Sequence, residues 1–328
     1  MTIIYALLVF LLVIMVHEFG HFIVAKLNNI KVNEFSIGMG PAIFKKQGEE
    51  TLYAIRALPI GGYVALEGEE DESDDPRSFS NAHPLKKIAV LVAGALMNFI
   101  LAIVLGVIVF STLGQQTTTI DSFVENSTAQ AAGLEAGDKI LYIDDKEIKT
   151  WPEISQTLNT SKKDKVTIKV QRDNEELVFQ VPTKEENGNH LIGIYPTLEK
   201  NFTSSLGASF QFTKDIIKQV YIFMGQLLTG RAKIEGLSGP VGIVRMIGDS
   251  AKQGFINVLM FACMISADVG AFNLFPFPAL DGGTIVITLI EWIVGKELPE
   301  KAKIVINSLG LIFLLGLIGY VTIFNDIL

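Results

Sequence analysis

The sequence predicts a polytopic α-helical membrane protein with four transmembrane helices, a re-entrant β-element on the cytoplasmic side and one extracytoplasmic α+β domain. Its mean hydropathy of +0.40 and its 49% content of hydrophobic residues exceed what a soluble domain of this length needs. The apolar residues come in blocks, and four blocks are long enough to cross a ~30 Å hydrocarbon core. These predicted spans run from Thr2 to Ala25, from Ile88 to Leu113, from about Phe255 to Leu280 and from Ile304 to Phe324.

The first span contains the motif His17-Glu18-Phe19-Gly20-His21. Residues four apart lie on one face of a helix, so His17 and His21 can bind one zinc ion with Glu18 beside it as a general base, as in HExxH metalloproteases. Ionisable side chains at membrane depth are costly unless a metal or a partner compensates them. We therefore predict a zinc site inside this span. A signal peptide is the alternative, but no basic segment precedes the apolar run and no small-residue cleavage site follows it.

Basic residues set the predicted orientation. The segment between the first two spans is rich in lysine and arginine close to the membrane ends, so the positive-inside rule places it in the cytoplasm. These residues are Lys26, Lys31, Lys45, Lys46, Arg56, Arg77, Lys86 and Lys87. Both termini then lie outside, and the His-Glu-His motif lies toward the cytoplasmic side. The net charge of −8 gives no reason to expect nucleic-acid binding.

Two further segments are partly apolar but are not predicted to cross the membrane. The stretch Thr284 to Val294 is too short to span, is interrupted by Glu291, and is expected to lie along the membrane interface. Residues 201–254 are expected to form an amphipathic connector, whose helical part carries Phe210, Ile217, Tyr221 and Met224 on its apolar side. The remaining predicted boundaries are 1–114 for the first two spans with the β-element, 115–200 for the extracytoplasmic domain and 255–328 for the last two spans.

The extracytoplasmic region 115–200 is polar and has alternating strand patterns at 166–170 and 177–181. Its segment Ala129-Gln-Ala-Ala-Gly-Leu-Glu-Ala-Gly-Asp-Lys-Ile140, followed by Ile143-Asp-Asp145, resembles the PDZ domains of bacterial membrane and envelope proteases. PDZ domains of this kind can add a peptide strand to an exposed sheet edge. The domain could therefore read substrates, or it could be a passive filter that admits only substrates trimmed of bulky outer domains.

Several motifs occur in an order typical of one family. They are the intramembrane HEFGH, Gly38-Met39-Gly40-Pro41, Gly61-Gly-Tyr-Val64, the PDZ-like segment, Ser238-Gly-Pro-Val-Gly-Ile243 and Asn273-Leu-Phe-Pro276-Phe-Pro278-Ala-Leu-Asp281-Gly-Gly283. Together they resemble the bacterial site-2 proteases, which are zinc intramembrane metalloproteases. The resemblance covers nearly the whole chain, and the single PDZ-like segment is more similar to the Gram-positive branch.

The resemblance implies a third metal ligand. The aspartate of the family's LDG motif completes its zinc site, and Asp281 occupies that position here. A catalytic zinc requires three protein ligands and one open position, of which His17 and His21 supply only two. Asp268, in a place where relatives usually carry asparagine, is a rival ligand, but we expect it to mimic the usual amide.

The resemblance also implies substrate contacts. Asn273 matches a family position implicated in substrate binding, although it could instead satisfy carbonyls of a broken helix. Pro276 and Pro278 cannot both lie in an unbroken helix, so the chain from 273 to 283 should be partly unwound where a peptide enters. The segment 33–53, with Gly38, Met39 and Gly40 at a turn, looks like the family's membrane re-entrant β-element, which could hold an extended substrate by strand addition.

These inferences predict a zinc-dependent intramembrane endopeptidase in the lipid bilayer of the bacterial plasma membrane. Its expected substrates are membrane proteins with a single transmembrane helix, such as an anti-sigma factor or the remnant of a signal peptide. A zinc-binding membrane scaffold without protease activity is the alternative. A transporter is a further possibility, because intramembrane carboxylates and broken helices occur there, but the four spans contain no internal repeat.

Overall fold

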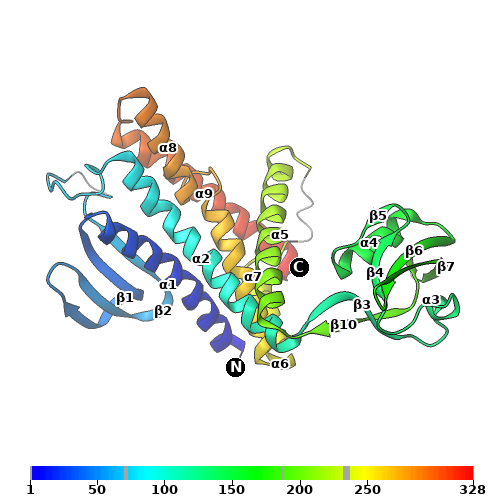
Figure 1. The fold of residues 1–328 in the computed structure, drawn as a ribbon. Helices are drawn as coiled ribbons and strands as arrows, with labels where there is room; N and C mark the ends of the chain where they lie inside the picture. The colour runs from blue at the N-terminus through cyan, green and yellow to red at the C-terminus, as the bar shows by residue number, and fades with distance from the viewer. Residues whose placement is uncertain (1, 70–72, 187, 232–236, 328) are drawn as a thin grey trace. The chain divides into compact units, whose positions relative to one another are not determined.

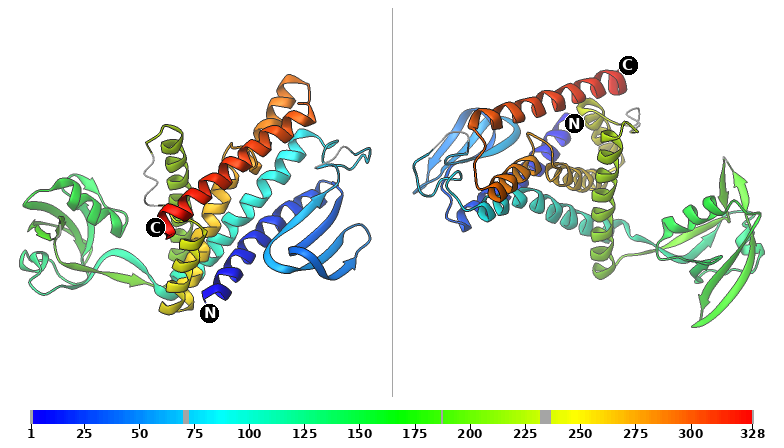
Figure 2. Two further views of the ribbon diagram at one scale, coloured as in Figure 1. Left: turned by 180° about the vertical axis from the view of Figure 1, so that it is seen from behind. Right: turned by 90° about the horizontal axis from the view of Figure 1, so that it is seen from above.

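The computed structural model describes residues 2–69, 73–186, 188–231 and 237–327 (Figures 1 and 2). The chain divides into two compact units. One unit combines residues 1–109 with residues 209–328, and the other consists of residues 110–208. The first unit is mainly helical, and the second is built on a β-sheet. Each unit has its own hydrophobic core.

Four helices of the described chain are long and apolar enough to cross a membrane, in agreement with the four predicted spans. They are α1 (Thr2–Leu27), α2 (Pro84–Leu113), α7 (Phe255–Asn273) and α9 (Glu300–Val321), which continues as the π-helix η2 (Thr322–Ile327). An α-helix satisfies its backbone polar groups internally, as a lipid-facing segment must. Within the helical unit, α1, α2 and α7 run side by side in all views (Figures 1 and 2).

The third span is shorter than predicted. Helix α7 ends at Asn273, whereas the apolar block continues to Leu280. Pro276 and Pro278 lack backbone N–H groups and cannot continue a helix, so the chain from 274 to 280 forms an irregular loop. The next helix, α8 (Asp281–Val294), begins three residues before the predicted interfacial stretch. Glu291, the charged residue of this stretch, forms an ion pair with Lys303 at 2.7 Å.

The three central helices are held together by small side chains and cross-helix hydrogen bonds. A Cβ atom added to Gly20 of α1 would lie 2.4 Å from the carbonyl oxygen of Ala93 in α2, so only glycine permits this approach. Between α2 and α7, Ser266 Oγ donates to the backbone oxygen of Asn98 at 2.8 Å, and Cys263 Sγ donates to that of Ala102 at 3.1 Å. Close packing and interhelical hydrogen bonds are what associate helices in a lipid environment.

The predicted connector contains two helices, α5 (Phe202–Leu228) and α6 (Pro240–Gln253). On the predicted apolar side of α5, Met224 is buried, whereas Phe210 and Tyr221 are 55% and 40% exposed. The buried residues recur every four positions instead, at Ile216, Val220 and Met224. Apolar residues lie on two sides of this helix, so its sequence periodicity does not identify the side that packs.

The C-terminal segment caps α6. The Asp326 carboxylate accepts hydrogen bonds from the backbone N–H groups of Gly239 and Gly242, at 3.0 and 2.8 Å. The first N–H groups of a helix have no partner within the helix, and a carboxylate there is also favoured by the helix dipole. The Ser238-Gly-Pro-Val-Gly motif therefore forms a capped helix start.

The β-element consists of β1 (Val32–Gln47) and β2 (Leu52–Leu66) beside α1 (Figure 1). The connecting turn lies at 48–51, where the N–H of Gly48 donates to the oxygen of Thr51 at 2.9 Å. Gly38 and Gly40 lie inside β1 at a second reversal of the chain. The partners of residues 34–37 rise from 52 to 55, whereas the partners of residues 42–47 fall from 56 to 52, so 32–37 and 42–47 run in opposite directions. The φ angles of Gly38 and Gly40, 82° and 81°, permit this turn, which agrees with the turn predicted there. Positive φ is readily available only to glycine.

The bends place the segment 62–66 at an edge of this sheet. Residues 32–37 pair with 62–66 on one side and with 52–55 on the other. The pairs of residues 62–66 are all with 32–37. One edge of 62–66 is therefore left to face α1, and its backbone N–H groups are available to other acceptors.

The second unit carries a sheet with the order β10-β3-β4-β6-β7, and β5 pairs with β4. The predicted strands at 166–170 and 177–181 lie within β6 and β7, and buried residues alternate along β6. The PDZ assignment of this unit stays a prediction. Its elements are β3 (Gln115–Phe123), α3 (Thr128–Ala131), β4 (Lys139–Ile143), β5 (Lys146–Glu147), α4 (Trp151–Ser161), β6 (Lys165–Arg172), β7 (Glu175–Pro182), β8 (Lys184–Glu186), β9 (Asn189–Leu191) and β10 (Ile194–Glu199).

Candidate metal centre

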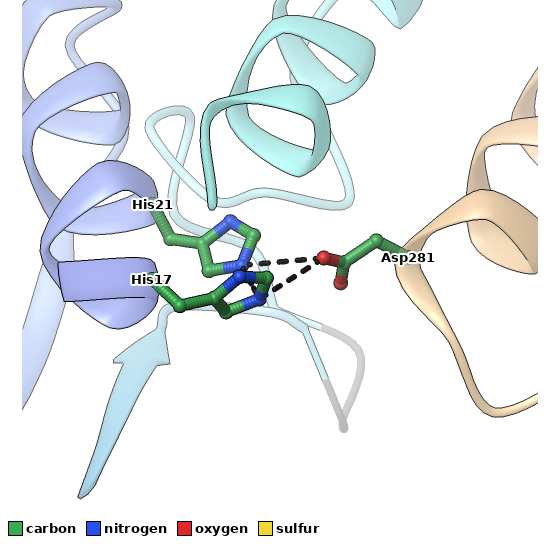
Figure 3. Close-up of side chains that lie close together, drawn as sticks. All are labelled: His17, His21 and Asp281. Atoms are coloured by element: carbon green, nitrogen blue, oxygen red, sulfur yellow. Dashed lines mark hydrogen bonds and ion pairs between the residues drawn. The ribbon is translucent and has the colours of Figure 1, made fainter. Parts of the chain in front are cut away.

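Three potential metal ligands converge from two distant parts of the chain (Figure 3). The Nε2 atoms of His17 and His21 are 3.1 Å apart, and they lie 3.2 and 3.5 Å from Oδ2 of Asp281. The three side chains are only 9%, 12% and 20% exposed. Asp281 Oδ2 is buried and meets no hydrogen-bond donor other than the two imidazoles within the described residues. Burying a carboxylate oxygen is unfavourable unless a cation lies beside it.

The spacing fits zinc. With Zn–N and Zn–O bonds of about 2.0–2.2 Å in a tetrahedral arrangement, neighbouring ligand atoms lie about 3.3 Å apart. The observed separations of 3.1, 3.2 and 3.5 Å bracket that value. Two imidazoles and one carboxylate are also a ligand set that catalytic zinc sites use.

Glu18 lies beside the three ligands and lines the same cavity. Its Oε2 accepts a hydrogen bond at 3.1 Å from the backbone N–H of Val64, which belongs to the free edge of 62–66. The carboxylate is therefore held by the strand edge while it remains next to the ligand cluster. A proton acceptor in this place can reach a molecule bound between the ligands and the strand.

Asp281 is positioned by the glycines that follow it. Asp281 is the first residue of α8, and the loop 274–280 folds back onto the start of that helix. A Cβ atom added to Gly282 would lie 2.3 Å from the oxygen of Phe275, and one added to Gly283 would lie 2.2 Å from the oxygen of Phe277. The two glycines permit this close approach of backbone to backbone, which brings the carboxylate to the histidines.

Comparison with known proteins agrees with this ligand arrangement. Residues 5–317 match the family described as Peptidase family M50. The chain belongs to peptidase family M50. It is 42% identical to a protein of Clostridium perfringens named a putative zinc metalloprotease, with 98% of each chain covered. Relatives of the same description in Clostridium acetobutylicum and Fusobacterium nucleatum are 39% and 35% identical, over 98% and 100% of this chain and 96% and 98% of theirs.

Membership of the M50 family establishes the coarse function. The chain is a zinc-dependent metalloprotease of a membrane-embedded family, and its four apolar helices agree with that setting. The match begins at residue 5 and ends at residue 317, so it includes the HEFGH motif and Asp281 in one family region.

The M50 site opens into a cavity of about 330 Å³. Of the residues predicted to bind substrate, Asn273 lines this cavity. The others are absent from its described lining, and they are Gly38, Met39, Gly40, Pro276 and Pro278. The lining consists of Ile14, His17, Glu18, His21, Val64, Leu66, Glu69, Val90, Leu91, Val269, Asn273 and Asp281.

Asp268 lies apart from the ligand cluster. It belongs to α7, like Asn273, but it neither lines the cavity nor joins the group formed by His17, His21 and Asp281 among the described residues. Asn273 and Val269 face the cavity, and Asp268 lies one residue before Val269, about 100° around the helix. This geometry favours Asp281 over Asp268 as the carboxylate ligand.

Sequence reasoning missed three contributors from α2. The His21 Nδ1 atom lies 2.8 Å from the backbone oxygen of Val90, and the His17 Nδ1 atom lies 3.3 Å from Nδ2 of Asn98. Gly94 lies between them, and a Cβ atom added there would be 2.4 Å from His21 Nε2. The only available signal was the polar Asn98 inside an apolar span, since intramembrane polar residues are functional candidates.

Replacing Gly94 by alanine is expected to weaken zinc binding about 10- to 100-fold. This is the range seen when groups that orient the metal ligands are changed. The added Cβ would also lie 2.7 Å from His17 Cε1, so both imidazoles must move. Competition with a chromophoric chelator measures the zinc affinity of the purified protein. Gly106→Ala is the control, because Gly106 also belongs to α2 but an added Cβ atom there would crowd Ser209 of α5 and none of the ligands. Equal zinc affinity of Gly94→Ala and the wild type would contradict this account of the site.

Proposed function

We propose that this M50 protease is an intramembrane endopeptidase that cleaves the transmembrane segment of membrane proteins with a single transmembrane helix. The observation that carries the proposal is the location of His17, Glu18 and His21 inside α1, a 26-residue apolar helix. His17 lies about 15 Å from the C-terminal end of α1, at a rise of 1.5 Å per residue. In a bilayer core of ~30 Å, that depth is accessible to a transmembrane segment and far from ordinary soluble substrates.

In this proposal His17, His21 and Asp281 hold the zinc ion. When bound, zinc supplies a Lewis acid that acidifies water and polarises a scissile carbonyl group. Glu18 takes a proton from the attacking water and later returns it to the leaving amine. The N–H of Val64 orients the Glu18 carboxylate for both transfers. The buried surroundings limit competing water.

The substrate must become extended before it is cut, because a helix hides its carbonyl groups behind its own hydrogen bonds. We place the extended segment along the edge 62–66, whose N–H groups at Val64 and Leu66 are held by Glu18 and Glu69 at 3.1 and 3.4 Å. An added peptide strand would offer a carbonyl oxygen to the N–H of Leu66 in place of Glu69, while the N–H of Val64 stays with Glu18. The glycine bend at Gly38, Met39 and Gly40 shapes the same sheet.

The unwound chain on the other side of the cavity is a second candidate for substrate contact. Asn273 lines the cavity at the end of α7 and can donate to or accept from a peptide group. Pro276 and Pro278 keep the following loop from forming a helix. The loop packs against α9, since a Cβ atom added to Gly310 would lie 2.5 Å from the oxygen of Pro278. We propose that this loop borders the path by which the substrate enters.

The proposed location is the bacterial plasma membrane, with both termini outside and the metal centre toward the cytoplasmic side. The basic residues between α1 and α2 support this orientation. The second unit, residues 110–208, then lies outside the cell membrane. We propose that it is a PDZ domain that either reads substrates or excludes bulky ones.

Removal of residues 115–200, with a short Gly-Ser linker in their place, is expected to leave cleavage of a short, trimmed helical substrate unchanged. If the domain excludes bulky substrates, cleavage of substrates with large outer domains should increase on its removal, and the metal centre is unaffected because its ligands lie in the other unit. Paired cleavage assays on trimmed and untrimmed forms of one substrate measure both effects. A deletion variant that folds and binds zinc, yet cannot cut the trimmed substrate, would contradict this prediction.

Reversible metal removal tests the proposed function. The purified protein is reconstituted in liposomes with a helical model substrate, stripped with a zinc chelator and then reloaded. We expect cleavage to stop on stripping, to return with zinc, and to yield new termini inside the apolar segment by mass spectrometry. Zinc binding without cleavage would favour the non-proteolytic scaffold. Solute or ion flux without cleavage would favour a transporter.

A further inference from the structure

The two histidines differ in what holds their second ring nitrogen. His21 Nδ1 faces the backbone oxygen of Val90 at 2.8 Å. A carbonyl oxygen can only accept, so His21 Nδ1 carries the hydrogen and Nε2 is left with a lone pair for a metal. His17 Nδ1 faces a side-chain amide instead, with Asn98 Nδ2 at 3.3 Å.

The Asn98 amide is mismatched to a metal-binding His17. If Nε2 of His17 binds the metal, its Nδ1 carries a hydrogen, and the Asn98 Nδ2 atom is also a donor only. Two donors would then face each other. The Asn98 Oδ1 atom, meanwhile, is buried and has no hydrogen-bond partner among the described residues. Asn98 itself is 0% exposed, so water does not readily compensate this oxygen.

A half-turn of the amide removes the contact between two donors and gives Oδ1 a partner, while Nδ2 moves to the position that Oδ1 occupied. Exchanging the oxygen and nitrogen positions barely changes the shape of the side chain, and their assignment rests on the surrounding hydrogen bonds. After the turn, Oδ1 would face the Nδ1–H group of His17 and accept its hydrogen. The arrangement would then match that of His21 and Val90, with one oxygen acceptor behind each metal-binding imidazole.

We propose that Asn98 is a positioning residue for the metal centre, whose side-chain oxygen accepts the hydrogen of His17 Nδ1 when zinc is bound. The inference rests on the proposed zinc ligands. An acceptor behind a metal-binding imidazole fixes its tautomer and orientation and strengthens its donation to the metal. Because the amide is neutral, it does so without adding a further charge to a site that already contains Glu18 and Asp281.

The main chain of Asn98 is anchored separately from its side chain. Ser266 Oγ donates to the backbone oxygen of Asn98 at 2.8 Å and links α2 to α7. A change of Ser266 therefore disturbs the packing around Asn98 without touching the contact with His17. This pair of contacts makes it possible to separate a structural effect from a positioning effect.

Zinc affinity of the full-length protein, measured by competition with a chromophoric chelator, tests the proposal. Asn98→Leu and Asn98→Ala remove the acceptor, and we expect the zinc Kd to rise about 10- to 100-fold. Asn98→Asp keeps an acceptor but has no donor, and it should retain a Kd within about threefold of the wild type, because carboxylates serve behind zinc-binding histidines. Ser266→Ala should also retain the wild-type Kd. The visible spectrum of the cobalt-loaded protein provides a second readout, which should change for Asn98→Leu and not for Ser266→Ala.

The outcomes separate this inference from the proposed function. If the wild-type protein binds no zinc, the proposed metal centre itself is wrong. If the wild type binds zinc and either apolar variant binds it equally well, Asn98 does not position His17. If Asn98→Asp loses as much affinity as Asn98→Leu in a folded protein, the donor group matters and the proposed orientation is wrong. If Ser266→Ala loses as much zinc affinity as Asn98→Leu, the loss comes from helix packing and not from the contact between Asn98 and His17.

Discussion

Glu18→Gln is expected to abolish peptide cleavage while zinc content stays at about one ion per chain. The amide cannot accept the proton of the attacking water, and general acid–base catalysis contributes about 10²–10⁴-fold to such reactions. The ligands His17, His21 and Asp281 are unchanged, and glutamine can still accept the hydrogen bond from the N–H of Val64. The loss should therefore appear in the rate of cleavage and not in metal binding or folding.

Glu69→Gln is a matched control for this experiment. Glu69 lines the same cavity and also accepts from a backbone N–H, that of Leu66 at 3.4 Å, but it is not part of the ligand cluster. The same change of carboxylate to amide should leave most of the cleavage rate at this second position. If Glu18→Gln cleaves the substrate at a rate close to that of the wild type, Glu18 is not the general base. If the variant loses zinc, Glu18 is a metal ligand.

Asp281→Asn is expected to lose both zinc and activity, whereas Asp268→Asn keeps zinc and most activity. Disturbing a contact behind a metal ligand lowers metal affinity by up to about 100-fold. Loss of one of the three ligands themselves should lower zinc affinity by more than that. Asp281 Oδ2 lies within 3.5 Å of both imidazole nitrogens. Asp268 is separate from that cluster, and asparagine would preserve its shape.

Zinc content per chain and the cleavage rate, measured on both variants, check this prediction. The two substitutions are chemically identical and fall at opposite ends of one stretch of chain, so each controls for the other. If Asp268→Asn releases the metal and Asp281→Asn does not, the ligand assignment is wrong. Retention of zinc by both variants would mean that neither carboxylate is needed for binding.

The local parts of the site were predictable from the sequence. His17 and His21 are four residues apart in one helix, so their common face follows from helix geometry alone. The membrane spans follow from composition, because the hydrocarbon core sets a minimum apolar length. The unwound stretch after Asn273 was likewise predictable from Pro276 and Pro278, although the long apolar block hid the point at which α7 ends.

The turn at 38–41 was predictable from the local sequence, because glycine and proline there are typical of a turn. The φ angles of 82° at Gly38 and 81° at Gly40 permit the chain to reverse there. The pairing of 32–37 with two segments, 52–55 and 62–66, depends on contacts between distant residues and was not predictable.

The sequence by itself determined the helix that carries His17, Glu18 and His21, and the apolar spans around it, because both depend on neighbouring residues and on the solvent. Asp281 lies 260 residues further along, and only family resemblance linked it to the histidines before the fold brought them within 3.5 Å. Only the tertiary structure revealed Gly94 and Asn98 of α2 as neighbours of the ligands. Contacts between helices depend on which faces pack, and in a chain whose helices are apolar on most sides, hydropathy does not specify those faces.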